Sequence, residues 1–209
     1  MLLSTRDRRR HALHCIAALA GVVLLPARAQ SEALTLAQLT QLLAQVKAGD
    51  ATFTEKRTVA LLDRTLESSG RLSFEAPDTF VRETLKPRRE KLAVVGNTVT
   101  MSQGNRSRNV PLDSVPEAAI IVEAIRGTLT GNRDALEHHF TASVSGSAQG
   151  WSLDLVPRDP RLREQVTSVR INGAQLLVRE VVVALADGDR SVMSIEPAPT
   201  ALKAASAPP

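Results

Sequence analysis

The segment that follows residue 33 has the hydrophobic spacing of an amphipathic helix. Thr35 and Gln38 stand three residues apart, which is the spacing of a capping box, where two side chains bind free backbone N–H groups at a helix start. Apolar side chains then recur at helical spacing, at Leu36, Leu39, Leu43 and Val46. We therefore expect a helix that opens the domain and ends near Gly49.

From Thr52 onward the pattern changes to alternation of apolar and polar residues, which is typical of strands. Leu72 and Phe74 share one face of an expected strand, while Arg71 and Ser73 share the other, so at least one face of the sheet contacts water. Candidate turns recur at short intervals, at residues 68–70, 76–78, 96–97 and 104–105. This pattern predicts an antiparallel meander.

A second helix interrupts the meander. Ser114 and Glu117 have capping-box spacing, and the segment up to Gly127 is apolar on most sides. Such a helix must cover another apolar surface, and we expect a short helical piece to follow at 132–138. Strand patterns then resume at 140–145, 151–156, 166–171, 176–185 and 191–195, with hairpin turns at 172–173 and 187–189. The sequence thus predicts about ten strands.

The two ends of the chain lie outside this expected domain of residues 30–196. Arginines at positions 6–10 precede an apolar run at 12–25, and Ala27 and Ala29 have the small side chains that signal peptidase needs. A membrane anchor is the weaker alternative, because the run is shorter than the roughly 20 residues that span a bilayer. We expect cleavage after Ala29, secretion into the periplasm and a disordered tail at 197–209.

Charge and composition exclude several classes of function. Residues 1–29 hold five arginines and one aspartate, which leaves 21 basic and 21 acidic residues in the rest of the chain. A neutral domain with only four Phe and one Trp lacks both the charge and the stacking surfaces that bind nucleic acids. The single cysteine, Cys15, lies in the segment expected to be removed, so we expect no disulfide, no thiolate metal site and no cysteine nucleophile. We also expect no cofactor.

The sequence contains no short catalytic motif. His138 and His139 beside Glu137 could serve as a general base, which keeps a periplasmic hydrolase open as an alternative. Asp187 and Asp189 could hold a cation, although a hairpin turn is the simpler interpretation. We expect a protein that is not an enzyme.

Three segments before Met101 carry a family signature. Residues 50–56 (DATFTEK) have the form A-x-F-x-Q, with Glu55 in the Gln position. Residues 69–80 (SGRLSFEAPDTF) have the form G-x-L-x-F and lead through Pro-Asp into the next strand, and residues 86–99 continue through Lys-Pro to VVGNTV. These segments resemble those of the LolA-type outer-membrane lipoprotein carriers, over about residues 34–195.

The resemblance implies a fold and a function. Members have a mainly β, α+β fold, in which an incomplete antiparallel β-barrel, or strongly curved sheet, is covered by helices around a hydrophobic cavity. They are carriers that bind acyl chains of lipoproteins, and they act as monomers between an inner-membrane donor complex and an outer-membrane acceptor. The sequence departs from the family at two positions. Ala76 stands where many members have Arg, and Arg82 stands where an aromatic residue is common. These departures indicate a divergent member without the usual polar latch on its cover.

The resemblance and the patterns together predict a cavity, its cover and its mouth. Arg82 alternates with Phe80 on one strand face, so it either pairs with a carboxylate on a neighbouring strand, lies exposed at the end of the sheet, or meets an acidic or carbonyl-bearing headgroup of the cargo at the cavity mouth. A lipid-sensing or lipoprotein-sensing module that regulates a membrane partner remains the alternative function. The expected ligand-binding residues are Phe53, Leu72, Phe74, Phe80, Arg82, Met101, Ile120, Ile121, Ile125 and Trp151.

Overall fold

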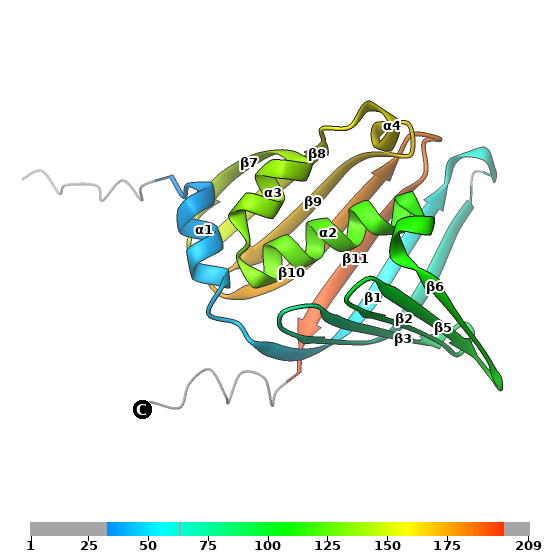
Figure 1. Ribbon diagram of the computed structural model, residues 1–209. Coiled ribbons are helices and arrows are strands. Elements are labelled where there is room, and N and C mark those ends of the chain that lie inside the picture. Colours follow the sequence, from blue (N-terminus) through cyan, green and yellow to red (C-terminus); the bar gives the residue numbers. More distant parts are fainter. Residues whose placement is uncertain (1–32, 63, 199–209) are drawn as a thin grey trace, which may run out of the picture. The chain divides into compact units, whose positions relative to one another are not determined.

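A computed structural model describes residues 33–62 and 64–198. The expected signal peptide, residues 1–29, and residues 199–209 of the expected tail lie outside the described residues. Within them, eleven antiparallel strands form one sheet in the order β6-β5-β4-β3-β2-β1-β11-β10-β9-β8-β7 (Figure 1). The strands are β1 Ala48–Val59, β2 Arg64–Glu75, β3 Thr79–Lys86, β4 Glu90–Val95, β5 Thr98–Gln103, β6 Arg106–Pro111, β7 Phe140–Ser147, β8 Gly150–Pro157, β9 Val166–Ala174, β10 Leu177–Leu185 and β11 Arg190–Pro197.

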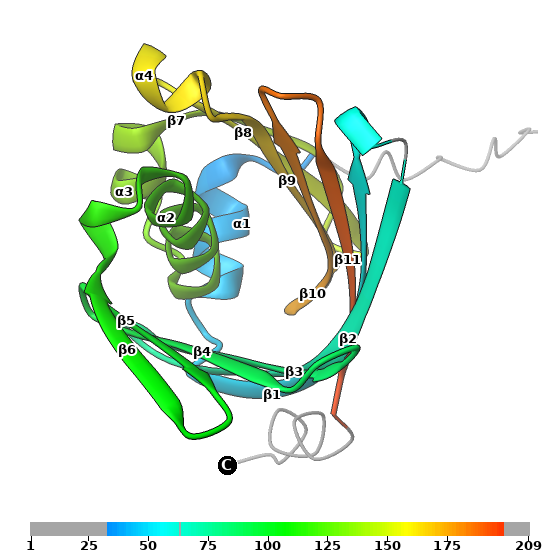
Figure 2. The same ribbon diagram turned by 90° about the vertical axis from the view of Figure 1, so that its right-hand side faces the viewer.

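α1, α2 and α3 lie on the concave face of this curved sheet (Figure 2). Only neighbouring strands pair, and the edge strands β6 and β7 do not pair with each other, so the barrel is incomplete. α2 and α3 lie on the side where these edges approach each other. The helices are α1 Leu36–Leu43, α2 Pro116–Thr130, α3 Arg133–His139 and α4 Pro160–Arg163, with short 3-10 turns η1 Ala60–Leu62 and η2 Leu112–Ser114. The expected fold class is confirmed.

Several local predictions are also confirmed. The side chain of Thr35 accepts a hydrogen bond from the backbone of Gln38, and the Gln38 side chain accepts one from the backbone of Thr35, as in a capping box. The short helical piece expected at 132–138 is α3, 133–139, and the side chain of its N-cap, Asn132, accepts a hydrogen bond from the backbone N–H of Ala135. The turns at 76–78, 96–97, 104–105 and 187–189 separate strands as expected.

Two helix boundaries were predicted wrongly. α1 ends at Leu43, and Gly49 lies inside β1 rather than at the end of a helix. Ser114 does not cap α2, because its hydroxyl donates to the carbonyl of Pro111 at 2.6 Å. The N-cap is Val115, and the helix starts instead with Pro116, whose fixed φ suits the first helical position.

Two expected turns, at 68–70 and 172–173, lie inside strands. Gly70 is in the middle of β2, where a Cβ atom would stand 1.9 Å from the Glu83 carbonyl oxygen of β3. Gly173 is in β9, where a Cβ atom would stand 2.2 Å from the ring of Trp151. Both glycines therefore permit a close approach rather than a change of chain direction.

Apolar side chains on the concave face form two separate cores. In the larger core α1, α2 and α3 pack on β7–β11, and Leu39, Ile120 and Leu155 are each at most 3% exposed. In the smaller core the other side of α2 packs on β3–β6: Val94, Val99 and Leu112 are buried, with Ala118, Ala119 and Val122 against them. α2 therefore separates two apolar surfaces and contributes side chains to both.

Candidate functional site

Strand alternation brings charged side chains into the concave face between the two cores. Phe53, Glu55 and Arg57 alternate on one face of β1, and their Cα partners on β11 include Ile195, which packs on the larger core. They therefore lie on the concave side. On β3, Arg82 occupies the same face, two residues from Phe80 of the smaller core.

Four side chains from four strands form what we call the Glu55 cluster: Glu55, Ser68, Arg82 and Ser191. The Arg82 guanidinium contacts the Glu55 carboxylate at 2.5 Å. Ser68 donates to Glu55 Oε2 at 3.0 Å, and Ser191 donates to Oε1 at 2.5 Å. Both carboxylate oxygens thus have partners, which offsets the cost of removing the charge from water.

Arg82 also lies over an aromatic ring. Its guanidinium carbon is 4.7 Å from the ring centroid of Phe53, which is 2% exposed, and this cation–π geometry is favourable. Of the alternatives from the sequence, the carboxylate partner is present, but it does not lie on a neighbouring strand. It belongs to Glu55 on β1, which is separated from β3 by β2.

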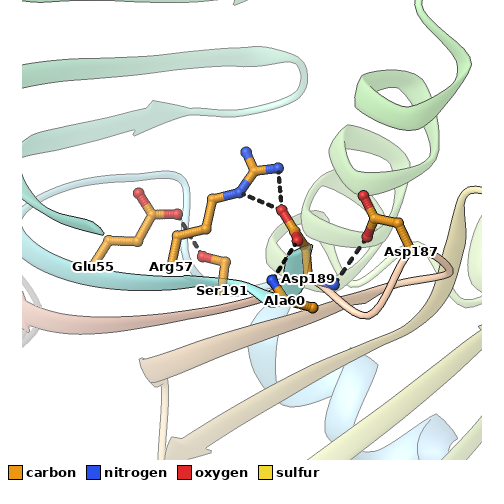
Figure 3. Close-up of polar contacts among 6 residues, drawn as sticks. All are labelled: Glu55, Arg57, Ala60, Asp187, Asp189 and Ser191. Atoms are coloured by element: carbon orange, nitrogen blue, oxygen red, sulfur yellow. Dashed lines mark hydrogen bonds and ion pairs between the residues drawn. The ribbon is translucent and has the colours of Figure 1, made fainter. Parts of the chain in front are cut away.

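A second ion pair continues the charged region toward the end of β1 (Figure 3). Arg57 donates to Asp189 Oδ2 from Nη2 at 3.0 Å and from Nε at 3.3 Å. The other oxygen of Asp189 accepts from the backbone N–H of Ala60 at 3.0 Å, and Asp187 accepts from the N–H of Asp189. The turn expected at 187–189 therefore uses its carboxylates to fix the end of the β1–β11 pair, which accounts for both aspartates without a cation.

The pKa of the Glu55 carboxyl lies below its ordinary value. Burial by itself raises this pKa, because it penalises the charged form. The positive charge of Arg82 and the hydrogen bonds from Ser191, Arg82 and Ser68 act in the opposite direction and together outweigh burial. Glu55 therefore remains ionised to a lower pH than an ordinary glutamate.

We expect the Glu55 cluster to contribute acid-sensitive stability. Because the folded-state pKa is lower than the unfolded one, the contribution is present above about pH 4.3, the ordinary glutamate pKa, and disappears as the pH falls through the folded-state value. Glu55→Gln should cost about 2 kcal/mol at pH 7 and should flatten the acid side of the stability profile. Urea unfolding between pH 7 and pH 3 measures both effects.

The control for this prediction is Glu75→Gln, because Glu75 is exposed on the opposite face of β2. It should leave both the stability at pH 7 and the slope of the profile unchanged. Equal pH profiles for Glu55→Gln and the unaltered protein would contradict the role given to the cluster.

A cavity of about 250 Å³ opens beside the cluster. It is smaller than the roughly 300–1,000 Å³ of pockets that enclose a drug-sized ligand, and five of the six residues that line it are polar or charged. In this conformation the apolar surfaces are instead occupied by the side chains of α1, α2 and α3. The lining residues are Glu55, Arg57, Arg82, Thr84, Glu90 and Leu92.

The structure divides the ten expected ligand-binding residues among several places. Ile120, Ile121 and Trp151 belong to the larger core, where the indole N–H donates to the Gln175 carbonyl at 3.1 Å. Phe74 and Phe80 stack at 5.1 Å beside the smaller core. The others are Phe53 and Arg82 in cation–π contact, Leu72 and Ile125, which are half-buried, and Met101, which is 40% exposed.

Sequence reasoning missed most of the Glu55 cluster. Ser68 was assigned to a turn, and Ser191 was not singled out. Glu55 was noted only as a substitute for Gln in the A-x-F-x-Q motif. The sequence did contain a signal for the ion pair. Glu55 replaces the Gln of the family motif and Arg82 replaces an aromatic residue, and two opposite charges on one sheet face tend to pair.

A different arginine connects α2 to the sheet. Arg126 donates to the carbonyl of Gly96, in the β4–β5 turn, at 2.8 Å and pairs with Glu123 at 2.6 Å. The substitutions at Ala76 and Arg82 led us to expect no polar latch on this helix. The Arg126 contact nevertheless provides a polar connection between α2 and the β4–β5 turn.

The histidines are placed at the end of α3. The rings of His138 and His139 meet edge to face, with centroids 4.7 Å apart. Among the described residues, no group of three or more His, Cys, Asp and Glu side chains has the arrangement of a metal site. In the same part of the chain, no helix combines the length and the apolar character needed to cross a bilayer.

Comparison with known proteins adds a family to this description. The sequence profile described as outer membrane lipoprotein carrier protein LolA-like matches residues 28–207. No curated protein gives a significant match.

Comparison with solved structures finds similarity at low sequence identity and with TM-scores below 0.5. One is a LolA superfamily protein, NE2245 from Nitrosomonas europaea, with 8% identity, a TM-score of 0.42 and coverage of 78% of this chain and 92% of the other. LprF from Mycobacterium bovis gives 10% identity and a TM-score of 0.35, with coverage of 77% and 91%. The MucA/MucB complex of Pseudomonas aeruginosa gives 14% identity and a TM-score of 0.39, with coverage of 78% and 56%.

Proposed function

Because the chain belongs to the family of LolA-like outer membrane lipoprotein carrier proteins, we propose that it carries lipidated proteins or another lipid through the periplasm. It receives this cargo from an inner-membrane donor complex and delivers it to an outer-membrane acceptor. In this proposal the chain acts as a monomer after removal of residues 1–29, and it catalyses no reaction.

The observation that carries this proposal is the position of α2 between two apolar surfaces. Ile120 and Ala124 contact the larger core, while Ala119 and Val122 contact the smaller one. When α2 moves away from the sheet, both surfaces become available to a ligand of matching character. An acyl chain is such a ligand, because it covers the apolar sheet surface that the helix leaves.

The need for a carrier follows from the free energy of exposing lipid. Moving an acyl chain from a bilayer into water costs roughly 0.8 kcal/mol for each CH₂ group. A chain of ordinary length therefore stands on the order of 10 kcal/mol above its membrane state. A protein that covers the chain with its own apolar residues removes most of this barrier.

We assign roles to the expected residues on this basis. The acyl chains of the cargo contact the sheet residues Phe53, Leu72, Phe74 and Phe80. α2 acts as the cover through Ile120 and Ile121. The contact of Arg126 with Gly96 at 2.8 Å keeps the cover in place while no cargo is bound.

The test is the cargo that purifies with the protein. Protein isolated from the envelope of its native cells under gentle conditions is analysed by native mass spectrometry, which retains bound lipid. We expect a mass increase that corresponds to a lipid or a lipidated protein. Repeated isolation of empty protein would contradict the proposal, and a stoichiometric membrane protein without lipid would favour the regulatory alternative.

A further inference from the structure

The apolar concave face continues beyond the area that the helices cover. On β4 and β5, Val94 and Val99 are buried in the smaller core, whereas Leu92 and Met101, the next residues on the same face, are 36% and 40% exposed. Leu92 and Met101 are Cα partners. They form a small apolar strip on the concave face that belongs to neither of the two described cores.

Arginines stand at both ends of this strip. The strand register places Arg82 of β3 opposite Leu92, and Arg108 of β6 opposite Met101. The row across the sheet is therefore Arg82, Leu92, Met101 and Arg108. The two arginines thus lie on either side of two apolar residues, and three strand spacings of about 4.8 Å each separate Arg82 from Arg108.

The charges of β1–β6 are distributed unequally between the two faces of the sheet. On the convex face the strands carry four acidic and four basic residues, and the face is neutral. On the concave face they carry two acidic residues, Glu55 and Glu90, and five arginines. The concave arginines are Arg57, Arg64, Arg82, Arg106 and Arg108.

Pairing within the protein neutralises only part of this positive charge. Arg82 pairs with Glu55, and Arg57 pairs with Asp189. Within the described residues, neither Arg106 nor Arg108 has a carboxylate within 4.0 Å.

We propose that this arginine-rich part of the concave face binds the phosphate-bearing headgroup of an anionic lipid, and that the adjoining strip of Leu92 and Met101 holds the start of its acyl chain. The inference rests on the proposed carrier function and names its cargo class. A guanidinium binds phosphate through two parallel hydrogen bonds. A zwitterionic headgroup also carries an ammonium group, whose positive charge weakens the attraction between its phosphate and an arginine. Arg106 and Arg108, which have no carboxylate partner among the described residues, are the groups that we assign to the phosphate.

The test compares two lipids that differ only in headgroup charge. Lysophosphatidylglycerol and lysophosphatidylcholine with the same acyl chain are titrated into the full mature protein by calorimetry, below the concentration at which they form micelles. We expect the anionic lipid to bind about tenfold more tightly at low salt, with a smaller difference at high salt. Replacing both outer arginines, Arg106→Gln with Arg108→Gln, should reduce this preference to less than threefold.

The matched control is Arg71→Gln, on the convex face of β2, which removes a positive charge and should leave the preference unchanged. Equal binding of both lipids would overturn the headgroup assignment and leave the carrier proposal standing. An Arg71 variant that loses as much preference as the double variant would also overturn it, because diffuse charge would then suffice. Failure of both lipids to bind would contradict the carrier proposal as well.

Discussion

The substitution Gly70→Ala is expected to cost about 3 kcal/mol of the free energy of unfolding, although it adds a single methyl group. The new Cβ atom would lie 1.9 Å from the carbonyl oxygen of Glu83 and 2.9 Å from the Cα atom of Thr84. Both atoms belong to the backbone of β3, so a strand and not a flexible side chain must move. The β2–β3 register is already irregular between Ser69 and Gly70. Urea unfolding measures the loss.

The control is Gly49→Ala in β1, where a Cβ atom meets nothing within 4 Å. This variant should be neutral or more stable by about 0.5 kcal/mol, because alanine restricts the unfolded chain. Equal stabilities of the two alanine variants would show that the close approach of β3 to β2 is not what selects glycine at position 70.

The substitution Ile120→Ala is expected to tighten lipid binding, even though it destabilises the protein. Ile120 is 3% exposed in the larger core, and truncation of such a side chain costs about 3 kcal/mol. If cargo displaces α2, this cost falls only on the closed, empty state. The equilibrium then shifts toward the open state, and the apparent dissociation constant should fall by up to about 100-fold.

The matched control is Leu153→Ala, which truncates a fully buried side chain of β8 in the same core. Residue 153 belongs to the sheet and does not move with α2, so its truncation should reduce stability without tightening binding. Titration of a fluorescent lysolipid into the variants compares them. Weaker or unchanged binding by Ile120→Ala would show that α2 is not displaced by the ligand.

The sequence was sufficient where structure depends on neighbouring residues. The capping box of Thr35 and Gln38 and the turn at 187–189 both involve groups within a few positions of each other. Alternation along β2 and β3 also assigned Phe74 and Arg82 to faces correctly. Such features require no knowledge of distant segments.

The sequence did not suffice where the role of a residue depends on a segment that is distant in the chain. A glycine that permits a close approach, such as Gly70 or Gly173, has the same local appearance as a glycine in a turn. The partner of Arg82 depends on a register across three strands, and alternation within one strand cannot supply it. The two faces of α2 could be recognised as apolar, but their assignment to separate cores required the arrangement of the sheet.

The most direct test of the carrier function is lipid transfer between two membranes. Donor vesicles hold a fluorescent lipid together with a quencher that cannot leave the membrane, and acceptor vesicles hold neither, so transfer appears as fluorescence. We expect the initial transfer rate to rise in proportion to the concentration of the mature protein, because each molecule carries lipid through water. A rate that stays at the spontaneous value at every protein concentration would contradict the account.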